Sequence, residues 1–333
     1  SFRGIRYGQP PIGSLRWAPP EMYEPTEADL REPYDATELR SVCPQPPYMC
    51  TRQGCSEDCL FLNVFRGANA SEEALPVAIF VHGGAYKTGS SNLYPAGELV
   101  DYWGGRSIVV TINYRLNVLG FLGAEQLRSL DEKDGSTGNQ GIQDQRLAFR
   151  WVQENIAAFG GDPSRVMIFG ESAGAGSVSM HLTMKKSFGY YSRAILESGS
   201  FAQWTMRPMQ HAQQMYESFV AGTTCEVDDL PCLQALSLDE VDAAMKQMGA
   251  HGIDENDKYE PFAPTADGVE ATTHAWIAIE DGQFNHDVSI LHGTNRDEGS
   301  NFCPTLPKNA TREDLHAYWA ACGLSEEEQD SLD

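Results

Sequence analysis

Short apolar runs alternate with amphipathic segments along the middle of the chain. Runs that are typical of buried strands occur at residues 75–82, 107–113, 166–169, 193–196 and 288–293. Between the second and third runs, apolar residues at helical spacing predict a helix over Ile142–Phe159. Continuous apolar strands that are separated by helices indicate a mostly parallel sheet with both faces covered. The pattern therefore predicts an α/β fold, in which catalytic side chains follow the carboxyl ends of strands.

Two regions depart from this alternation. The first sixty residues are rich in Pro, Tyr and Cys, and we expect them to be irregular. Residues 201–280 have weaker strand signals and several amphipathic patterns, which predict a helical excursion between the fourth and fifth strands. No internal repeat or low-complexity linker interrupts the chain, which favours a single domain over residues 1–333.

The most specific chemical signal is the segment RVMIFGESAG at residues 165–174. Its strand breaks into Gly170-Glu171-Ser172-Ala173-Gly174, which is the G-x-S-x-G pattern of a nucleophile elbow. The glycines allow the strand and the next helix to approach closely, because a side chain there would clash. That helix, expected over about Ala173–Met184, directs its positive N-terminal end toward the serine hydroxyl. We therefore predict that Ser172 is the nucleophile of an acyl-transfer reaction.

A loop after the first apolar strand supplies candidate donors for the oxyanion. The strand runs into His82-Gly83-Gly84-Ala85, where adjacent glycines can turn their backbone N–H groups toward a substrate carbonyl. Together with the N–H of Ala173, those of Gly84 and Ala85 would form an oxyanion hole with three donors.

The candidate acid follows the fifth strand. Glu298 lies in the segment Gly293–Gly299, and Asp297 beside it is a local alternative. The order of a serine followed by an acid and then a histidine is the order of this architecture. After Glu298 the only histidine is His316, in a segment that predicts a short amphipathic helix over Thr311–Cys322, capped by Thr311. We expect the base to come from beyond residue 333 instead.

Composition limits the partners of the chain. Its formal net charge of −23 disfavours binding to nucleic acid and to anionic membranes. No apolar run reaches the length of about 18 residues that a transmembrane helix needs. The eight cysteines include no pair of Cys-x-x-Cys motifs at zinc spacing, so we expect disulfides and no metal. With the sequons at Asn69 and Asn309, this favours a secreted or lumenal protein.

Motifs along nearly the whole chain closely resemble those of type-B carboxylesterases, the family that includes cholinesterases, bile-salt-activated lipase and fungal lipases. Besides the elbow, the matching segments are residues 2–11, 56–63, 113–115, 139–146, 155–163, 194–200 and 297–299. The resemblance implies an α/β-hydrolase fold and ester hydrolysis by a Ser-Glu-His triad that needs no cofactor. Ser172 and Glu298 stand at the matching positions, and the family's supporting polar residues correspond to Glu171 and Ser198.

The resemblance also implies covalent and ionic links. It pairs Cys43 with Cys59 and Cys225 with Cys232, and we assign the remaining cysteines as Cys50–Cys55 and Cys303–Cys322. Two ion pairs, Arg16–Glu57 and Arg115–Asp144, are similar to pairs of the family.

The chain departs from the family pattern in three ways. The family's histidine lies roughly a hundred residues after the acid, and its opening strands precede the residue that is Ser1 here. We therefore expect a single domain that lacks its N-terminal start and its C-terminal part, with a companion chain as one source of the latter. The loop between Cys43 and Cys59 contains no tryptophan, which disfavours acetylcholine and favours a neutral ester.

Two alternatives to this interpretation remain. One is a non-catalytic adhesion or scaffold protein of the same fold, such as a neuroligin, because a fold does not determine a function. The presence of the nucleophile, the acid and the glycine-rich loop together favours the enzyme. The other alternative is a lipase that acts on long-chain acyl esters.

Overall fold

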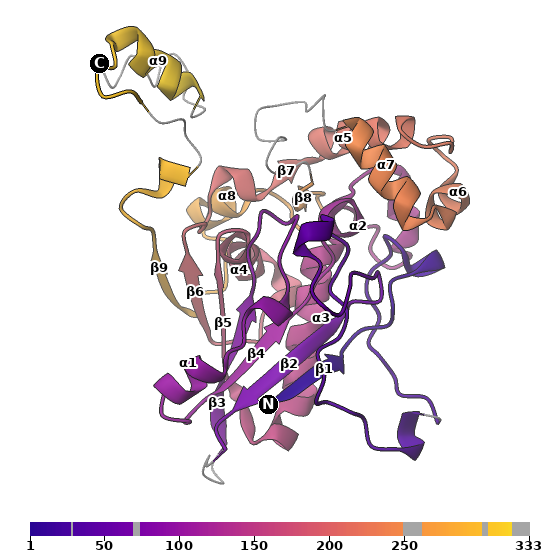
Figure 1. The fold of residues 1–333 in the computed structure, drawn as a ribbon, viewed down its shortest axis with the longest axis vertical. Helices are drawn as coiled ribbons and strands as arrows, with labels where there is room; N and C mark the ends of the chain where they lie inside the picture. The colour runs from indigo at the N-terminus through magenta and orange to yellow at the C-terminus, as the bar shows by residue number, and fades with distance from the viewer. Residues whose placement is uncertain (28, 69–73, 249–261, 302–305, 322–333) are drawn as a thin grey trace. The chain divides into compact units, whose positions relative to one another are not determined.

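The computed structural model describes residues 1–27, 29–68, 74–248, 262–301 and 306–321 (Figure 1). The chain divides into two compact units, Ser1–His292 and Gly293–Asp333. The smaller unit contains the 3₁₀ helix η10 (Glu298–Asn301) and the helix α9 (Arg312–Ala321). Thr311 caps α9 as the sequence predicts, because the backbone N–H of Asp314 donates to its hydroxyl at 3.2 Å.

A mixed sheet forms the centre of the larger unit. Its strands lie in the order β1 (Phe2–Arg6), β2 (Phe61–Arg66), β4 (Ile108–Ile112), β3 (Leu75–Val81), β5 (Gly161–Glu171), β6 (Arg193–Glu197) and β9 (Ser289–Gly293). The neighbours β4, β3, β5 and β6 run parallel, whereas β2 is antiparallel to both β1 and β4. The apolar runs of the sequence correspond to β3, β4, β5, β6 and β9, so the prediction of a mostly parallel α/β sheet is confirmed.

The expectation of an irregular N-terminal region is wrong at β1, and β2 was not predicted either. Both strands carry polar side chains that interrupt the apolar pattern. Asn63 of β2 is buried, and its amide donates to the hydroxyls of Ser91 and Thr111 while it accepts the N–H of Gly4 at 2.8 Å. Because these partners come from distant segments, the local sequence does not mark Asn63 as an interior residue.

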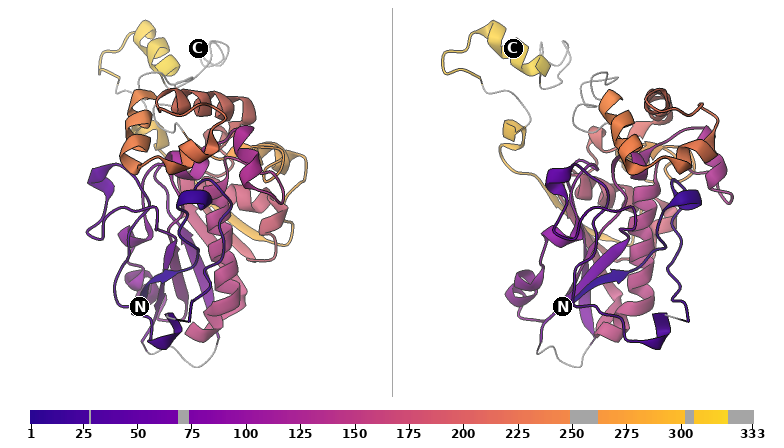
Figure 2. Two further views of the ribbon diagram at one scale, coloured as in Figure 1. Left: turned by 90° about the vertical axis from the view of Figure 1, so that its right-hand side faces the viewer. Right: turned by 45° about the vertical axis from the view of Figure 1, so that its right-hand side comes forward.

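Helices cover both faces of the sheet (Figure 2). On one face, α1 (Gly97–Tyr102) packs against Phe65 and Val109. The alternating neighbours Val64 and Val110 point to the other face and belong to the main core. This face carries α3 (Gln140–Asn155), which corresponds to the predicted helix and continues into a 3₁₀ turn. The helix α4 (Ala173–Thr183) follows β5 directly.

Residues 249–261 lie outside the described part, and the described residues of the segment 201–280 are largely helical. The helices are α5 (Met209–Ala221), α6 (Leu230–Ala235), α7 (Leu238–Met248) and α8 (Ala275–Glu280). Two short strands, β7 (Arg207–Pro208) and β8 (Thr265–Ala266), pair in parallel within this segment. In Figure 1, α5, α6 and α7 lie at the end of the larger unit that is remote from the N-terminus. Among the described residues, we find no helix with the length and apolarity needed to cross a membrane.

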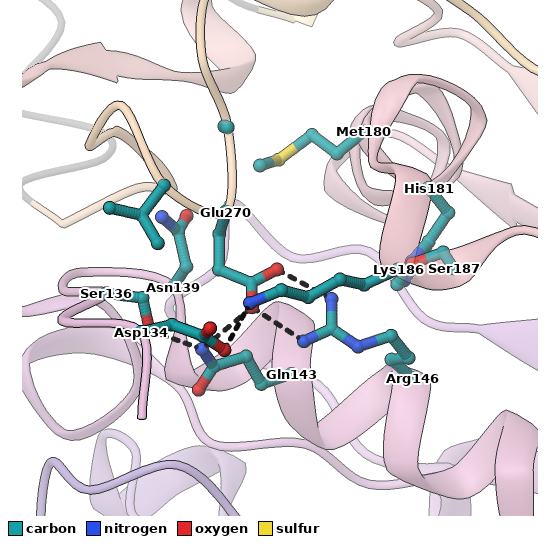
Figure 3. A network of polar contacts seen from close by, with 12 residues as sticks. Asp134, Ser136, Asn139, Gln143, Arg146, Met180, His181, Lys186, Ser187 and Glu270 are labelled. Atoms are coloured by element: carbon teal, nitrogen blue, oxygen red, sulfur yellow. Dashed lines mark hydrogen bonds and ion pairs between the residues drawn. The ribbon is translucent and has the colours of Figure 1, made fainter. Parts of the chain in front are cut away.

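An ionic network around the buried carboxylate of Glu270 links the segment after β8 to α3 (Figure 3). The carboxylate of Glu270 lies 2.7 and 2.8 Å from the two terminal guanidinium nitrogens of Arg146. Lys186, in the turn after α4, lies 3.0 Å from Glu270 and 2.7 Å from Asp134. The amide of Gln143 donates to Glu270 at 3.3 Å. Three segments that are distant in the sequence thus share one set of charges.

Disulfides link Cys43 to Cys59, Cys50 to Cys55 and Cys225 to Cys232, as assigned from the sequence. Cys303 and Cys322 lie outside the described residues. The two ion pairs implied by the resemblance are present. Arg16 contacts Glu57 through two nitrogens, each 2.7 Å from an oxygen, and Arg115 contacts the fully buried Asp144 at 2.8 Å.

Candidate active site

The turn between β5 and α4 holds Ser172 in a strained backbone conformation. Its φ is +55° and its ψ is −123°, although a serine rarely adopts a positive φ. The N–H of Ser172 donates to the carbonyl of Glu197 on β6 at 2.9 Å, which fixes this conformation. The side chain is half-buried and lies at the carboxyl end of β5. Such strain persists only where the surroundings over-determine it, and it is common at functional sites.

Three glycines give the turn the room it needs. A Cβ at Gly170 would lie 2.6 Å from the carbonyl carbon of Gly174. A Cβ at Gly174 would collide with the carbonyl oxygen of Val81, and one at Gly199 with that of Ser172. The close approach of β5, α4 and the loop after β6 therefore excludes any side chain at these positions.

The loop after β3 lies directly against the elbow. A Cβ at Gly83 would lie 2.5 Å from the carbonyl oxygen of Glu171 and 3.1 Å from Cβ of Ser172. The register of the sheet agrees, because Val81 at the end of β3 pairs with Gly170. The structure thus brings the glycine-rich loop and Ser172 together from two neighbouring parallel strands.

This loop has an unusual run of left-handed residues. Gly84, Ala85 and Tyr86 have φ values of +107°, +54° and +50°. The two non-glycine residues cost about 1–3 kcal/mol each in this conformation. The N–H groups of Gly84 and Ala85 make no hydrogen bond to another residue of the described ranges, whereas the Gly84 carbonyl accepts N–H groups from Lys87 and Thr88. Ala173 is the first residue of α4, so its N–H has no partner within the helix.

His82, which precedes the loop, is packed in the interior next to Tyr114. The ring of His82 stacks on Tyr114 with centroids 4.4 Å apart, and the Tyr114 hydroxyl donates to the His82 carbonyl at 2.7 Å. Complete burial lowers the pKa of the His82 ring to about 4, so the ring is neutral at physiological pH. A neutral, immobile ring fits a structural role.

His181 on α4 is likewise an interior residue. Its ring nitrogens lie 2.9 Å from the Ser187 hydroxyl and 2.9 Å from the side-chain oxygen of Gln145. Burial also lowers the pKa of His181 well below its ordinary value. Both nitrogens therefore have partners inside the core.

Glu171 and Ser198, which the resemblance assigns as supporting residues, lie at the ends of neighbouring strands. Glu171 is the last residue of β5, and its Oε2 would lie 3.1 Å from a Cβ at Gly83. Ser198 follows β6 with a φ of +56°. Both residues are therefore adjacent in the chain or in the sheet to the elbow.

The acidic candidates and His316 belong to the smaller unit. Glu298 begins η10, and its Oε1 accepts the backbone N–H of Asn295 at 2.7 Å. Glu298 is half-buried, and its neighbour Asp297 is exposed. His316 lies on α9, where its ring is 5.4 Å from that of Trp319. Of the proposed groups, the larger unit contains the nucleophile and the three N–H donors, and the smaller unit contains the acid.

Sequence reasoning missed the role of Asn113, which fixes the segment after the loop. Its side chain accepts the N–H of Ser91 at 2.8 Å and donates to the carbonyls of Cys59 at 3.0 Å and Ser41 at 3.2 Å. The available signal was a polar residue directly after the buried strand β4. In the ranges that the structure describes, we find no group of three His, Cys, Asp or Glu residues that would hold a metal ion.

The model of the carboxylesterase family matches residues 1–329. The chain belongs to the carboxylesterase family. The para-nitrobenzyl esterase of Bacillus subtilis is 37% identical over 90% of this chain and 59% of its own length. Neuroligin-3 of Mus musculus is 31% identical over 90% of this chain and 39% of its own length.

The fold of this carboxylesterase-family chain is the α/β-hydrolase fold. The crystal structure of the Geobacillus stearothermophilus carboxylesterase EST55 matches with a TM-score of 0.79 and 34% identity. The match covers 99% of this chain and 62% of that structure. The chain spans about half the length of the curated relatives it matches.

Proposed function

We propose that the protein to which this chain belongs is a serine carboxylesterase that hydrolyses neutral esters through an acyl-enzyme. Ser172 attacks the carbonyl carbon of the ester, and a histidine from beyond residue 333 accepts its proton. Glu298 orients this histidine and stabilises the cation that it becomes. The alcohol leaves with that proton, and a water molecule then releases the acid from Ser172 by the same steps. No cofactor is required.

The N–H groups of Gly84, Ala85 and Ala173 would hold the oxyanion of each tetrahedral intermediate. Preorganised donors of this kind stabilise charge that develops only in the transition state. The observation that carries the proposal is the contact between the Gly83 backbone and the strained Ser172 turn. The contact brings a half-buried serine against Gly83, and the N–H groups of the next two residues, Gly84 and Ala85, have no hydrogen-bond partner among the described residues.

The alternative of a non-catalytic adhesion protein is supported by the similarity to Neuroligin-3. The two hypotheses differ in what they require of Ser172, because only an enzyme needs its hydroxyl. A lipase differs from an esterase in its preference for long acyl chains and aggregated substrate.

We also propose that the protein is secreted or lumenal and glycosylated. Three disulfides support an oxidising compartment. The sequon residue Asn309 is exposed, as a glycan acceptor must be, and Asn69 lies outside the described residues. The C-terminal part that supplies the histidine would belong to the same polypeptide or to a companion chain.

The test is hydrolysis of p-nitrophenyl acetate by the full protein purified from its natural source or expressed at its natural length. Ser172→Ala should lower kcat by about 10⁴ or more, because removing a triad member leaves only residual catalysis. Ser164→Ala is the control, since this exposed serine lies on β5, the strand that leads to Ser172. Equal, negligible rates for all three proteins would favour the adhesion hypothesis. Faster hydrolysis of p-nitrophenyl palmitate in emulsion than of the acetate would indicate a lipase.

A further inference from the structure

One glutamine side chain clamps the loop that carries the proposed oxyanion donors. Gln45 donates from Nε2 to the carbonyl of Gly89 at 3.0 Å and accepts the N–H of Gly89 at Oε1 at 2.9 Å. The same Nε2 donates to the carbonyl of Cys43 at 3.1 Å. A single amide therefore pairs with Gly89 as a neighbouring strand would, and this needs a donor and an acceptor on one side chain.

Gly89 packs closely against His82 and Gly83, and Gly83 contacts the elbow. The φ of Gly89 is +110°, and a Cβ there would collide with the ring of His82 and lie 2.6 Å from the carbonyl oxygen of Gly83. Gly83 in turn lies against Glu171 and Ser172. Contacts thus run without a gap from Gln45 through Gly89 and Gly83 to the serine turn.

The backbone around Gln45 is linked to the central sheet. Cys43, two residues before Gln45, is buried and forms the disulfide with Cys59. The carbonyl of Cys59 accepts a hydrogen bond from Asn113, which directly follows the central strand β4. Gln45 is therefore anchored to the sheet, and the loop of residues 83–89 is anchored to Gln45.

We propose that Gln45 is a positioning residue for the oxyanion hole. It keeps the loop of residues 83–89, in which Gly84, Ala85, Tyr86 and Gly89 are left-handed, in the conformation that leaves the N–H groups of Gly84 and Ala85 available beside Ser172. Gln45 touches neither the substrate nor the reacting atoms, and its effect passes through Gly89. The inference rests on the proposed esterase function.

Steady-state kinetics with Gln45→Glu test this role. The substitution keeps the length of the side chain and the acceptor but loses the donor when the carboxyl group is ionised, so the Gly89 carbonyl loses its partner. We expect kcat for p-nitrophenyl acetate to fall about tenfold to a hundredfold, since losing one oxyanion donor outright costs about 10²–10³. KM should change by less than about twofold, because the ground-state carbonyl makes little use of the oxyanion hole.

Two further readouts separate positioning from a general loss of structure. The Ser172 hydroxyl adds to the carbonyl of an aryl trifluoromethyl ketone, and the adduct carries an oxyanion. The affinity for this ketone should fall by the same factor as kcat/KM. The ratio of variant to unsubstituted kcat should rise as pH falls, because the introduced carboxyl group donates again once it is protonated. Gln53→Glu, in the same disulfide loop, is the matched control, and its ratio should stay near one at every pH.

Specific results would overturn the inference. Unchanged kcat and ketone affinity in Gln45→Glu and in Gln45→Ala, with the unsubstituted protein active, would show that Gln45 does not position the loop. A loss that appears only as a lower thermal midpoint, with kcat unchanged below it, would assign Gln45 a structural role alone. An unsubstituted full-length protein that hydrolyses no ester would overturn the proposed function itself. Hydrogen exchange at the Gly89 amide tests the contact with Gln45 independently of ester hydrolysis. If Gln45 holds Gly89, exchange should be faster in Gln45→Ala than in the unsubstituted protein.

Discussion

Arg146 and Glu270, which are 124 residues apart in the sequence, form a bidentate ion pair. The Glu270 side chain is 2% exposed. The carboxylate is removed from water, and its oxygens are instead surrounded by the nitrogens of Arg146, Lys186 and Gln143. Removing one partner of a buried pair leaves the other charge uncompensated, which is more costly than an exposed pair is worth.

We predict that Glu270→Gln lowers the free energy of unfolding by about 3 kcal/mol, within the range for broken buried pairs. Glu154→Gln is the matched control, because Glu154 on the same helix as Arg146 pairs with the exposed Arg150. The control should change stability by about 0.5 kcal/mol or less. Urea unfolding followed by tryptophan fluorescence measures both, and equal effects of the two substitutions would contradict the prediction.

The same pair gives stability a pH dependence. Burial alone would raise the pKa of Glu270, but the hydrogen bonds and charges of Arg146 and Lys186 outweigh it and hold the pKa below its ordinary value. The folded state therefore binds this proton less readily than the unfolded state, so the contribution is complete above about pH 4.3 and is lost as pH falls below it. The stability difference between the unsubstituted protein and Glu270→Gln should be constant from about pH 8 to 5 and shrink in stronger acid.

His82 produces a second acid-sensitive contribution at higher pH. Burial lowers the pKa of its ring from 6.5 to about 4, so between these values the unfolded state binds a proton that the folded state does not. Stability should therefore decrease as pH falls from about 6.5 toward 4. NMR should show the His82 ring neutral at about pH 6, and a ring that titrates near its ordinary pKa of about 6.5 in the folded protein would show this account to be wrong.

The close approach at the elbow predicts the effect of one added methyl group. Gly83→Ala would place a Cβ 2.5 Å from the Glu171 carbonyl oxygen, so the loop or the serine turn must shift. We expect a loss of kcat of at least about a hundredfold, because oxyanion donors act only when accurately placed. Gly97→Ala is the control, since no atom lies within 4 Å of its Cβ position. Full activity of folded Gly83→Ala would contradict the proposed site.

The central strands β3 and β4 are predictable from the sequence because both of their faces are largely buried. Apolar residues therefore follow one another without interruption, as in Ile108–Ile112. The elbow is predictable because its glycines are required by backbone contacts that recur in one local pattern. The strand β2 escaped prediction because the burial of its Asn63 is offset by hydrogen bonds to partners outside the strand.

Tertiary contacts decide the features that the sequence does not reveal. The left-handed conformation of Ala85 and Tyr86 has no local signature, since neither residue type favours it. It is stabilised from elsewhere, as by the hydrogen bond from the Asn117 N–H to the Tyr86 carbonyl at 2.8 Å. Gln45 is 44 residues from Gly89, so their pairing follows from the fold and not from any motif.

A pair of isosteric substitutions in the full-length protein would decide whether Glu298 or Asp297 is the acid. Glu298 begins η10 and is half-buried, whereas Asp297 is exposed, so its carboxylate is hydrated by solvent. A carboxylate that orients the base must be held in one place, so we expect Glu298→Gln to lower kcat by about 10⁴, as loss of a triad acid does. Asp297→Asn should lower kcat by less than about tenfold, because it leaves the orientation of the base unchanged. The reverse order in the p-nitrophenyl acetate assay would assign the role to Asp297.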